Sequence, residues 1–423
     1  MTRSYLLPRG APVRDRSISD WVETLQSLPP DAPVGVVGAG AMGSGIAQVA
    51  LRAGHAVVLA DARPDAAERA AEGIARNLAR EVEKGRLAAA EADEALGRLR
   101  AVRGTEDLGP FAECAVVVEA VVEELGAKRA LFARLERETR DDAVLATNTS
   151  SLAVTAIAAA CRRPERVLGV HFFNPAPVLP LVEIVPGLAT DAGVLGAVRA
   201  LVDAWGKTTV VASDTPGFIV NRVARPFYGE ALRVRDEGLA DAATVDWALR
   251  ERGGFRMGPF ELMDFIGHDV NFAVTRSVYE QTYHDPRYRP SLTQQRLVEA
   301  GRLGRKAGRG FYDYADGAAR PEPRRDEALG DALVRRVVAM LVNEAADAVH
   351  WGVCSARDVE LAMTKGVNYP RGLLAWGDLI GAAEVAAEVD GLRERYQEDR
   401  YRVSPLLRRV AREGGRLAPA GVA

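Results

Sequence analysis

A glycine-rich turn between an apolar run and a helical pattern limits the folds open to this chain more than any other feature. The run VGVV precedes Gly38, Gly40 and Gly43, which have the spacing G-x-G-x-x-G. The next segment, IAQVALRAG, has helical spacing of its apolar residues, and a second apolar run, AVVLA, ends just before Asp61. This order of strand, tight turn, helix and strand predicts a dinucleotide-binding unit at the start of a doubly wound sheet.

Each glycine of the turn has its own physical reason in a nucleotide site. Gly38 permits the sharp turn, Gly40 lets the backbone approach a pyrophosphate, and Gly43 allows the helix to pack closely on the strand. The helix N-terminus offers free N–H groups to phosphate oxygens. Asp61 is placed to accept hydrogen bonds from the adenosine ribose, which favours NAD over NADP, although Arg63 weakens that preference. A glycine-rich turn without a nucleotide is the alternative interpretation.

The composition argues against several other classes of function. The chain has 423 residues, enough for two or three domains, with 48% apolar and 27% charged residues and a net charge of -3. Without a cluster of basic and aromatic residues, this charge argues against nucleic-acid binding. No apolar run approaches the roughly 18 residues of a membrane span. The three cysteines fit neither a disulfide framework nor a metal site, so we expect a cytoplasmic protein without a metal.

The order of elements along the chain predicts an α/β fold followed by helices. Strand and helix signals alternate through residues 32–213, which predicts a Rossmann-type, mostly parallel, doubly wound sheet. The helical stretch from 62 to about 100 is too long for a simple crossover, so we expect a helical hairpin that projects from the sheet. An apolar strand is expected at 114–123. Residues 1–31 contain no secretory signal and are interpreted as an N-terminal extension.

An internal repeat predicts that the helical region is duplicated. EALRVRDEGLADAATVDWAL at 230–249 matches EAADAVHWGVCSARDVELAM at 344–363, an offset of 114 residues, and DFIG and DLIG recur at the same offset. A charged linker that contains prolines separates the copies near residue 320. We therefore expect one all-helical domain at 214–318 and a second, degenerate copy at 319–423.

A histidine and a glutamate stand twelve residues apart in the apolar segment HFFNPAPVLPLVEIV. His171 lies near the carboxyl end of an expected strand, where ligands bind in open α/β sheets. A histidine is suited to remove an alcohol proton while hydride passes to a nicotinamide. Glu183 is able to orient the imidazole across the chain reversal through NPAPVLP. The alternative is a buried histidine that is satisfied by an acid and has no catalytic role.

Six segments, in chain order, resemble the L-3-hydroxyacyl-CoA dehydrogenase family: GAGAMGSGIAQVA, VVEAVVEE, ATNTSSL, HFFNPAPVLPLVEIVPG, TPGFIVNRV and GRKAGRGFYDY. The resemblance covers residues 34 to about 315. It implies NAD as cofactor and the oxidation of a (3S)-3-hydroxyacyl-CoA to a 3-ketoacyl-CoA. The acyl chain length stays open, as does an acyl carrier protein in place of CoA.

The resemblance also implies roles for individual residues. His171 matches the general base and Glu183 its orienting partner. Ser150 matches a serine that contacts both substrate and cofactor, and Asn221 matches an asparagine that holds the reacting oxygen and the substrate carbonyl. The implied cofactor-binding residues are Gly38, Gly40, Ala41, Met42, Gly43, Asp61, Glu123, Lys128, Ser150, Asn174 and Lys306. The implied substrate-binding residues are Asn77, Lys84, Ser150 and Asn221, and Asn77 stands where some relatives have a serine.

Ordinary structural roles stay open for several of these residues. Asn148 and Ser150 are also typical of turns and helix caps. Asn221 fits the first turn of a helix without a ligand, and Lys84 fits a solvated helix surface.

The duplicated tail narrows the resemblance further. The two-copy arrangement, with NYPRGLLAWGDLIG in the second copy, is similar to longer bacterial enzymes of phenylacetate degradation that oxidise 3-hydroxyadipyl-CoA. At the offset of 114, Asn221 corresponds to Arg335, so we expect the second copy to be structural. In one-copy relatives these helical domains form the dimer interface, which implies either a homodimer or an intrachain pseudo-dimer. No enoyl-CoA hydratase domain is recognised before the glycine turn.

Two other functions compete with this interpretation. A β-hydroxyacid-type dehydrogenase also has a GxGxMG turn, but it uses a catalytic lysine and substrates without CoA. A non-catalytic NAD-binding protein would keep the fold and would reduce no NAD with any hydroxyacyl-CoA. The intact set of His171, Glu183, Ser150 and Asn221 favours the dehydrogenase.

Overall fold

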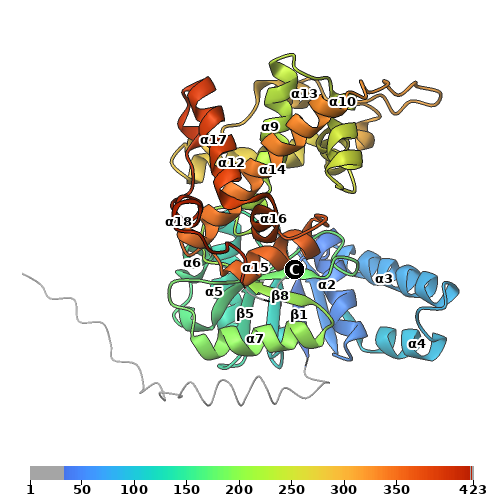
Figure 1. The fold of residues 1–423 in the computed structure, drawn as a ribbon. Helices are drawn as coiled ribbons and strands as arrows, with labels where there is room; N and C mark the ends of the chain where they lie inside the picture. The colour runs from blue at the N-terminus through green and yellow to red at the C-terminus, as the bar shows by residue number, and fades with distance from the viewer. Residues whose placement is uncertain (1–32, 420, 422–423) are drawn as a thin grey trace, which may run out of the picture.

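The computed structural model of this chain describes residues 33–419 and 421 and has two lobes (Figure 1). One lobe contains a sheet with helices on both faces, and the other is built almost wholly from helices. The expected N-terminal extension, residues 1–31, lies outside the described residues. Within the described part, no helix is long and apolar enough to cross a membrane.

The described strands form one sheet in the order β3-β2-β1-β4-β5-β6-β7-β8. Strands β1 to β6 are parallel, β7 is antiparallel to β6, and β8 is parallel to β7. The predicted mostly parallel, doubly wound sheet is therefore confirmed. The strands are β1 (Val34–Val37), β2 (Val57–Asp61), β3 (Leu99–Arg103), β4 (Val116–Glu119), β5 (Val144–Thr147), β6 (Val167–Phe172), β7 (Leu181–Pro186) and β8 (Thr208–Val211).

Two strands differ from the sequence-based expectation. The strand expected at 114–123 ends four residues earlier, at Glu119, so Glu123 lies in the following loop. The edge strand β3 was not predicted because its sequence, LRAVR, places arginines among the apolar residues and none of its residues is fully buried. Pairing with β2, rather than an apolar pattern of its own, makes this segment a strand.

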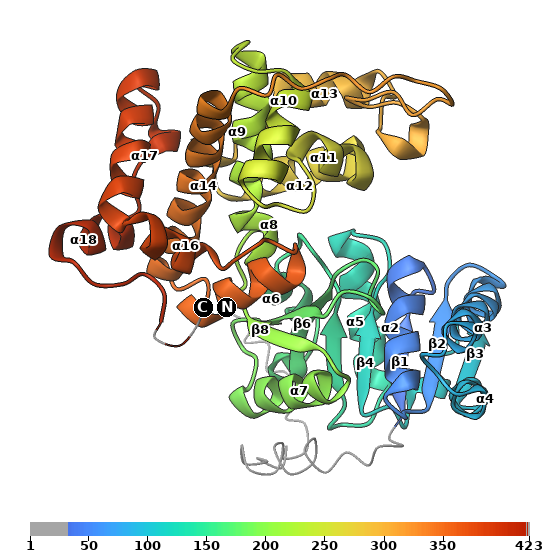
Figure 2. The ribbon, with the colours of Figure 1, turned by 45° about the vertical axis from the view of Figure 1, so that its right-hand side comes forward.

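Helices cover both faces of the sheet. Apolar side chains of α2 (Ala41–Arg52), α3 (Ala66–Glu83), α4 (Ala89–Gly97) and α7 (Ala192–Ala204) share a core with one face. Helices α5 (Leu125–Glu138) and α6 (Val154–Ala158) pack on the other face. The expected hairpin consists of α3 and α4 and lies at the end of the sheet farthest from β8 (Figure 2).

The rest of the chain forms helices that belong to two copies of one motif. The first copy contains α8 (Val220–Val223), α9 (Arg225–Asp236), α10 (Ala242–Trp247), η3 (Ala248–Arg252), α11 (Pro259–Ile266), α12 (His268–Gln281), η4 (Pro286–Tyr288), α13 (Leu292–Glu299) and η5 (Arg305–Ala307). The second contains α14 (Glu327–His350), α15 (Ala356–Leu361), η6 (Ala362–Gly366), α16 (Leu373–Ile380), α17 (Ala382–Tyr396), η7 (Asp399–Tyr401) and α18 (Pro405–Glu413).

Matching hydrogen bonds support the duplication. In the first copy, the carboxylate of Asp246 accepts from the backbone N–H groups of Phe260 and Glu261 at the start of α11. At the offset of 114, the carboxylate of Glu360 accepts from the first N–H groups of α16 in the same way. Both copies also contain a π-helical turn, η3 and η6, at equivalent positions. The repeat in the sequence therefore corresponds to a repeat in the structure.

Each copy supplies one buried carboxylate that arginine and tyrosine side chains of the other copy bind. Glu344 on α14 of the second copy accepts from Arg222 of the first copy, with a Nε–Oε1 distance of 2.9 Å. Arg287 lies 3.2 Å from the other oxygen of Glu344, and the Tyr288 hydroxyl also donates to this carboxylate. All four side chains are nearly inaccessible to solvent.

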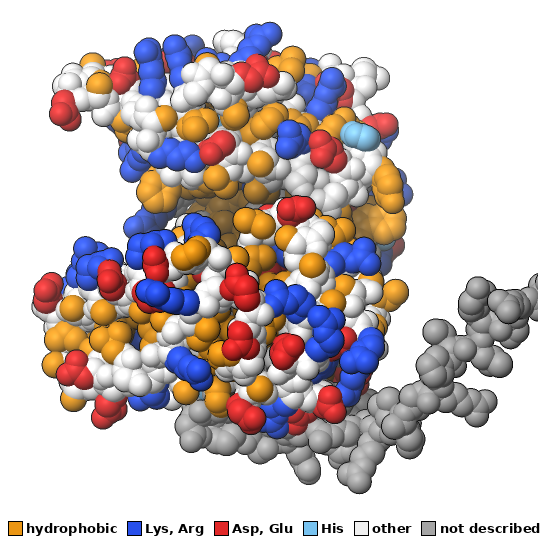
Figure 3. All heavy atoms as spheres, turned by 180° about the vertical axis from the view of Figure 1, so that it is seen from behind, with side chains coloured by type: hydrophobic (Ala, Val, Ile, Leu, Met, Phe, Trp, Pro, Cys, Tyr) orange, Lys and Arg blue, Asp and Glu red, His pale blue; other side chains and the backbone are white. Residues whose placement is uncertain are grey.

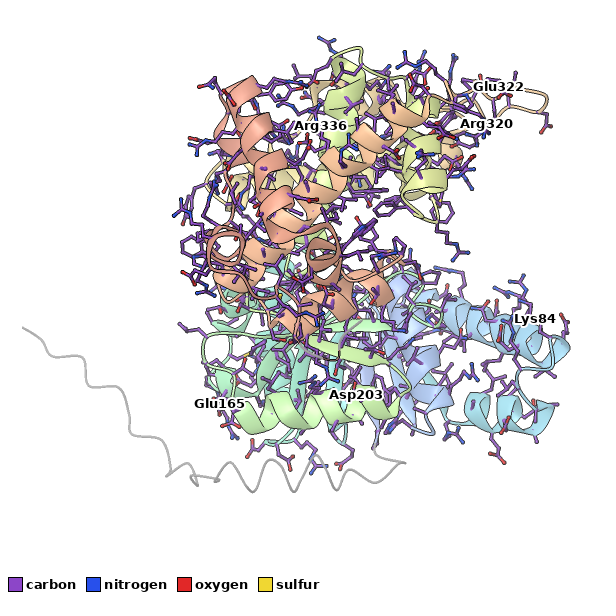
Figure 4. The ribbon with its side chains drawn as sticks, viewed as in Figure 1. Lys84, Glu165, Asp203, Arg320, Glu322 and Arg336 are labelled. Carbon is purple, nitrogen blue, oxygen red and sulfur yellow. The ribbon has the colours of Figure 1, made fainter. Side chains whose placement is uncertain are left out.

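The equivalent residues make the same contacts with the roles of the two copies reversed. Glu230 on α9 of the first copy accepts from Arg336 of the second at 2.9 Å and from the Tyr401 hydroxyl at 3.1 Å, and Arg400 lies 3.5 Å away. Figure 4 shows Arg336 inside the helical lobe. The carboxylate and the first arginine recur at the offset of 114, and the arginine–tyrosine pair recurs at 113. The contact between the copies is therefore reciprocal, as in a two-fold interface.

Candidate active site

The histidine and the glutamate of the segment HFFNPAPVLPLVEIV face each other across two antiparallel strands. The register of β6 and β7 pairs His171 directly with Glu183, so their side chains lie on the same face of the sheet. The distance from His171 Nδ1 to Glu183 Oε2 is 2.7 Å. The Glu183 side chain is completely buried, and His171 is 6% exposed. The chain reversal expected from the sequence is thus the element that brings the pair together.

Glu183 also ties the sheet to the helical lobe. Its second oxygen, Oε1, accepts from the backbone N–H groups of Ile219 at 3.0 Å and Val220 at 2.9 Å, at the start of α8. Asn221 follows directly on the same short helix, where it is partly exposed. One carboxylate therefore positions both the imidazole and the helix that carries the predicted substrate asparagine.

The environment of His171 suits a proton acceptor. Because Glu183 accepts at Nδ1, we assign the ring proton to that nitrogen, which leaves Nε2 free to take a proton. The rings of Phe173 and Phe218 lie 4.6 Å and 5.8 Å from the imidazole centroid and limit its contact with water. Seen from behind, the molecular surface is hollowed between the two lobes (Figure 3).

A second cluster holds the turn after β5. The Glu123 carboxylate oxygen Oε1 accepts from the Thr149 hydroxyl at 2.6 Å, from the Ser150 N–H at 3.0 Å, and from the N–H and hydroxyl of Ser151 at 3.1 Å and 2.9 Å. Although burial raises the pKa of Glu123, the nearby Lys128 ammonium and these hydrogen bonds outweigh it and leave the pKa below its usual value. The ionised carboxylate fixes the backbone that presents Ser150.

Lys128 lies beneath this turn rather than at the surface. Its side chain is 1% exposed, and its ammonium lies 2.5 Å from Glu119 Oε1 and 3.2 Å from Glu123 Oε2. Glu119 also accepts from the Thr147 hydroxyl at 2.7 Å. Glu119 was not predicted from the sequence, because the expected strand continued to residue 123 and placed Glu119 in its middle. An acidic residue at the carboxyl end of an apolar strand could have indicated a site residue.

The glycine turn has the geometry that a dinucleotide requires. Gly38 adopts a φ of +104°, and a Cβ there would lie 2.4 Å from the Ala120 carbonyl oxygen. A Cβ on Gly43 would lie 1.7 Å from the Gly38 carbonyl oxygen. A Cβ on Gly40 would meet nothing within 4 Å, so the space beside it is open to a ligand. The residues present therefore fit a bound pyrophosphate.

This contrast makes a prediction for two alanine variants. Gly40→Ala should fold with unchanged thermal stability but bind NAD roughly tenfold more weakly, a loss of about 1.4 kcal/mol, because the new methyl occupies the ligand's space. Gly43→Ala should lose about 1–3 kcal/mol of folding free energy, because helix α2 must move off the strand. Calorimetry and NAD titration measure both effects.

The control for the glycine variants is Gly97→Ala. This glycine ends α4, and a Cβ there also meets nothing within 4 Å, but it lies away from the turn. Its NAD affinity should match that of the unmodified protein. An unchanged NAD affinity in Gly40→Ala would argue against a pyrophosphate at this turn.

Asp61 follows the strand that leads away from the turn. Its carboxylate accepts from the Ala39 N–H at 2.8 Å, and from the Arg63 N–H and Nε at 2.9 Å and 3.0 Å. Burial raises the pKa of Asp61, but the hydrogen bonds from Arg63 outweigh it and the net pKa is lowered. The carboxylate is thus ionised and supports the glycine turn, while Arg63 shares the position where a ribose hydroxyl would bind.

The remaining predicted ligand residues lie at several places around the turn. A cavity of about 320 Å³ between α2 and α3 is lined by Gly40, Ala41 and Asn77, among others. Asn77 donates to Gln48 Oε1 at 3.2 Å. Lys84 follows the last turn of α3 and is exposed (Figure 4). The cavity brings Asn77, but not Lys84, next to the glycine turn.

Three further residues lie on exposed or partly exposed segments. Met42 lies in the first turn of α2 and is partly buried, and Asn174 is exposed just after β6. Lys306, in η5 of the helical lobe, pairs with Asp269 at 2.7 Å and remains half exposed. Their contacts with a cofactor stay predictions.

Family models match nearly the whole described chain. The model "3-hydroxyacyl-CoA dehydrogenase, NAD binding domain" matches residues 33–215. The model "3-hydroxyacyl-CoA dehydrogenase, C-terminal domain" matches twice over, at residues 217–314 and 333–423. The second model thus covers both helical copies.

Individual relatives agree with the family models. A 3-hydroxyadipyl-CoA dehydrogenase of Escherichia coli K12 is 40% identical, over 89% of this chain and 97% of the relative. A 3-hydroxybutyryl-CoA dehydrogenase of Bradyrhizobium diazoefficiens is 41% identical, over 69% of this chain and 98% of the relative. Among solved structures, a 3-hydroxybutyryl-CoA dehydrogenase of Escherichia coli K12 superposes with a TM-score of 0.86 at 39% identity, over 90% of this chain and 98% of that one.

Proposed function

The chain belongs to the 3-hydroxyacyl-CoA dehydrogenase family, an NAD-dependent family of oxidoreductases, and we propose that it oxidises a (3S)-3-hydroxyacyl-CoA with His171 as general base. The observation that carries this proposal is the buried His171–Glu183 pair, with Nδ1 bonded to the carboxylate and Nε2 free. No second function has a comparable observation in its favour.

In the proposed reaction, the protein's own groups handle the proton and the substrate oxygens. Nε2 of His171 takes the proton of the 3-hydroxyl group, and Glu183 stabilises the imidazolium that forms. Ser150 and Asn221 hold the hydroxyl oxygen and the thioester carbonyl. NAD, when bound, would supply the acceptor for the hydride of carbon 3.

The cofactor contacts are proposed on the same basis. The three glycines, with Ala41 and Met42, would hold the pyrophosphate at the start of α2, and Asp61 would hold the adenosine ribose. Glu123 and Lys128 support this site through the turn that carries Ser150, and we propose direct or indirect contact with the nicotinamide half. The assignments of Asn174 and Lys306 rest on the family resemblance alone.

For the substrate, we propose a short or dicarboxylic acyl-CoA, such as 3-hydroxybutyryl-CoA or 3-hydroxyadipyl-CoA. The names of the two relatives described above support these two acyl groups. A dicarboxylic substrate would place the enzyme in phenylacetate catabolism, and a short acyl group in fatty-acid β-oxidation. Asn77 and Lys84 are proposed to contact the CoA moiety.

A kinetic comparison tests this function. We expect the protein to reduce NAD with (3S)-3-hydroxybutyryl-CoA but not with free 3-hydroxybutyrate, because the proposed site recognises a thioester. Absorbance at the NADH band measures the rate. Turnover of the free acid alone would favour the β-hydroxyacid-type alternative, and the absence of turnover with any hydroxyacyl-CoA would favour a non-catalytic protein.

We also propose that the two helical copies act as an intrachain pseudo-dimer, with domains at 32–213, 214–318 and 319–423. The reciprocal burial of Glu344 and Glu230 supports this arrangement, because each copy supplies the cations for the other's carboxylate. Arg335, the counterpart of Asn221, is exposed on α14, which supports a structural role for the second copy. The cysteines of the described chain are free, consistent with a proposed location in the reducing cytoplasm.

A further inference from the structure

An arginine close to the proposed substrate asparagine is buried without an anionic partner. Arg225 begins α9, four residues after Asn221, and is 6% exposed. Its Nη1 donates to the Thr275 hydroxyl at 2.9 Å, and its guanidinium lies 4.9 Å from the ring centroid of Tyr228. Its Nε has no hydrogen-bond partner, and no carboxylate of residues 33–419 forms an ion pair with it.

Other buried arginines of this protein have more partners than Arg225, although the Nε atoms of Arg166 and Arg287 also lack a hydrogen bond among the described residues. Arg222, Arg287 and Arg336 each lie between at least two carboxylates. Arg166 has no carboxylate partner but donates to three backbone carbonyl oxygens. Arg225, in contrast, donates only one hydrogen bond within the described part of the chain, to the Thr275 hydroxyl. Burial accordingly lowers the pKa of its guanidinium.

A tyrosine of the second copy is unsatisfied at the same place. Tyr369, which follows η6, is 6% exposed, and its hydroxyl has no hydrogen-bond partner among the described residues. Its ring packs 5.0 Å from Phe255 and 5.7 Å from Phe227. Phe227, on which the Tyr369 ring packs, lies two residues after Arg225 on α9, so Tyr369 lies beside the start of this helix. The two copies of the helical motif therefore place one guanidinium and one hydroxyl with unused donors in the same region, around the start of α9.

A buried charge and a buried hydroxyl without partners are both costly to folding, so their retention points to a ligand that completes them. A carboxylate fits this pair of donors best, because it is an acceptor-only anion with two oxygens. The second copy, which lacks a counterpart of Asn221, would thereby contribute to the site through Tyr369.

The position of Arg225 relative to Asn221 limits which carboxylate-containing ligands can bind both residues. α8 and α9 are nearly continuous, and Ala224 between them keeps a helical conformation, so Asn221 and Arg225 lie on the same side, about 6 Å apart along the axis. In a six-carbon dicarboxylic acyl group, three bonds separate the 3-hydroxyl carbon from the terminal carboxyl carbon, which span roughly 4 Å. The axial separation exceeds the span of the acyl group by about 2 Å, a difference that the long Arg225 side chain can cover.

We propose that Arg225 and the Tyr369 hydroxyl bind the terminal carboxylate of a dicarboxylic 3-hydroxyacyl-CoA, while Asn221 and His171 hold its reacting end. This inference rests on the proposed dehydrogenase function and selects the dicarboxylic class from the substrates considered there. It makes Arg225 and Tyr369 specificity-determining residues, and it assigns them no part in proton transfer.

The test compares two substrates that differ only at the far end. 3-Hydroxyhexanoyl-CoA has a methyl group where 3-hydroxyadipyl-CoA has the terminal carboxylate. We expect kcat/KM to be roughly 10- to 100-fold higher for the adipyl substrate, the range of charge-assisted hydrogen bonds. Arg225→Met should bring the ratio of the two kcat/KM values to within about threefold of one, and Tyr369→Phe should lower it by about three- to tenfold.

The matched control is Arg276→Met, the same substitution at an arginine on the exposed side of α12, which should leave the ratio unchanged. A second readout avoids dependence on turnover: adipyl-CoA, which lacks the hydroxyl, should raise the melting temperature of the unmodified protein more than hexanoyl-CoA does. This difference should disappear in Arg225→Met. Arg225→Met should itself melt no lower than the unmodified protein, because it removes an unpaired buried charge.

The possible failures are distinguishable. If the unmodified protein oxidises hydroxyacyl-CoA substrates but does not prefer the adipyl one, the carboxylate site is wrong and the dehydrogenase function stands. A strong preference that survives in Arg225→Met would likewise overturn the site, because another group must then recognise the carboxylate. No activity on any of these substrates would overturn the proposed function and this inference together.

Discussion

His171→Ala is expected to lower kcat by at least about 10²-fold, the usual contribution of a general base, while NAD affinity remains close to that of the unmodified protein. The reason is geometric. Nε2 of His171 is the nitrogen left free when Glu183 holds Nδ1, whereas the glycine turn that would bind the cofactor belongs to β1 and α2. Steady-state kinetics with a 3-hydroxyacyl-CoA and a separate NAD titration measure the two quantities.

The folded state should tolerate this substitution. Without the imidazole, Glu183 still accepts from the N–H groups of Ile219 and Val220, so the carboxylate is not left unpaired. His350→Ala is the matched control, because His350 is exposed at the end of α14. A kcat of His171→Ala equal to that of this control would remove His171 from the mechanism.

Glu344→Ala is expected to cost about 3–5 kcal/mol of unfolding free energy, the range for breaking a buried ion pair by removing one partner. Among the described residues, the change leaves Arg222 and Arg287 with Asp347 and Asp285 as their remaining anionic partners. The Tyr288 hydroxyl loses its acceptor at the same time. Urea unfolding at neutral pH measures the loss.

The reciprocal contact adds a second expectation. Glu230→Ala removes the equivalent carboxylate, so its loss of stability should be similar in size. Glu394→Ala, at an exposed position of α17, serves as control and should change stability by no more than about 0.5 kcal/mol. Equal stability of Glu344→Ala and this control would contradict the pseudo-dimer, whose two halves depend on these exchanged charges.

Loss of Glu344 should also affect catalysis. Arg222, which Glu344 holds, is the residue directly after Asn221 on α8. A release of this helix would move the proposed substrate asparagine, so we expect kcat/KM to fall along with stability. On this expectation the second copy supports the proposed site through α8, even though it has no counterpart of Asn221.

Local sequence patterns were sufficient for the parts of the site that depend on neighbouring residues. The glycine turn was predictable because its three glycines, the preceding strand and the following helix are contiguous. The pairing of His171 with Glu183 was predictable because only a short chain reversal separates two apolar strands. In both cases the spacing along the chain nearly determines the spacing in three dimensions.

Contacts between distant segments were not predictable in this way. The burial of Glu119 beside Lys128 depends on the residue at which β4 ends. The strand β3 forms because its backbone pairs with that of β2. The unsatisfied pair of Arg225 and Tyr369 joins residues 144 positions apart.

The sequence by itself determined the fold class, the duplication and the pairing of His171 with Glu183, because hydrophobic periodicity, turn residues and repeat spacing act over short stretches of chain. Only the tertiary structure decided which charges meet inside the helical lobe. A charged residue looks the same in a sequence whether it is solvated, exchanged between copies like Glu344, or buried without a partner like Arg225. That difference depends on desolvation, which is a property of the packed molecule.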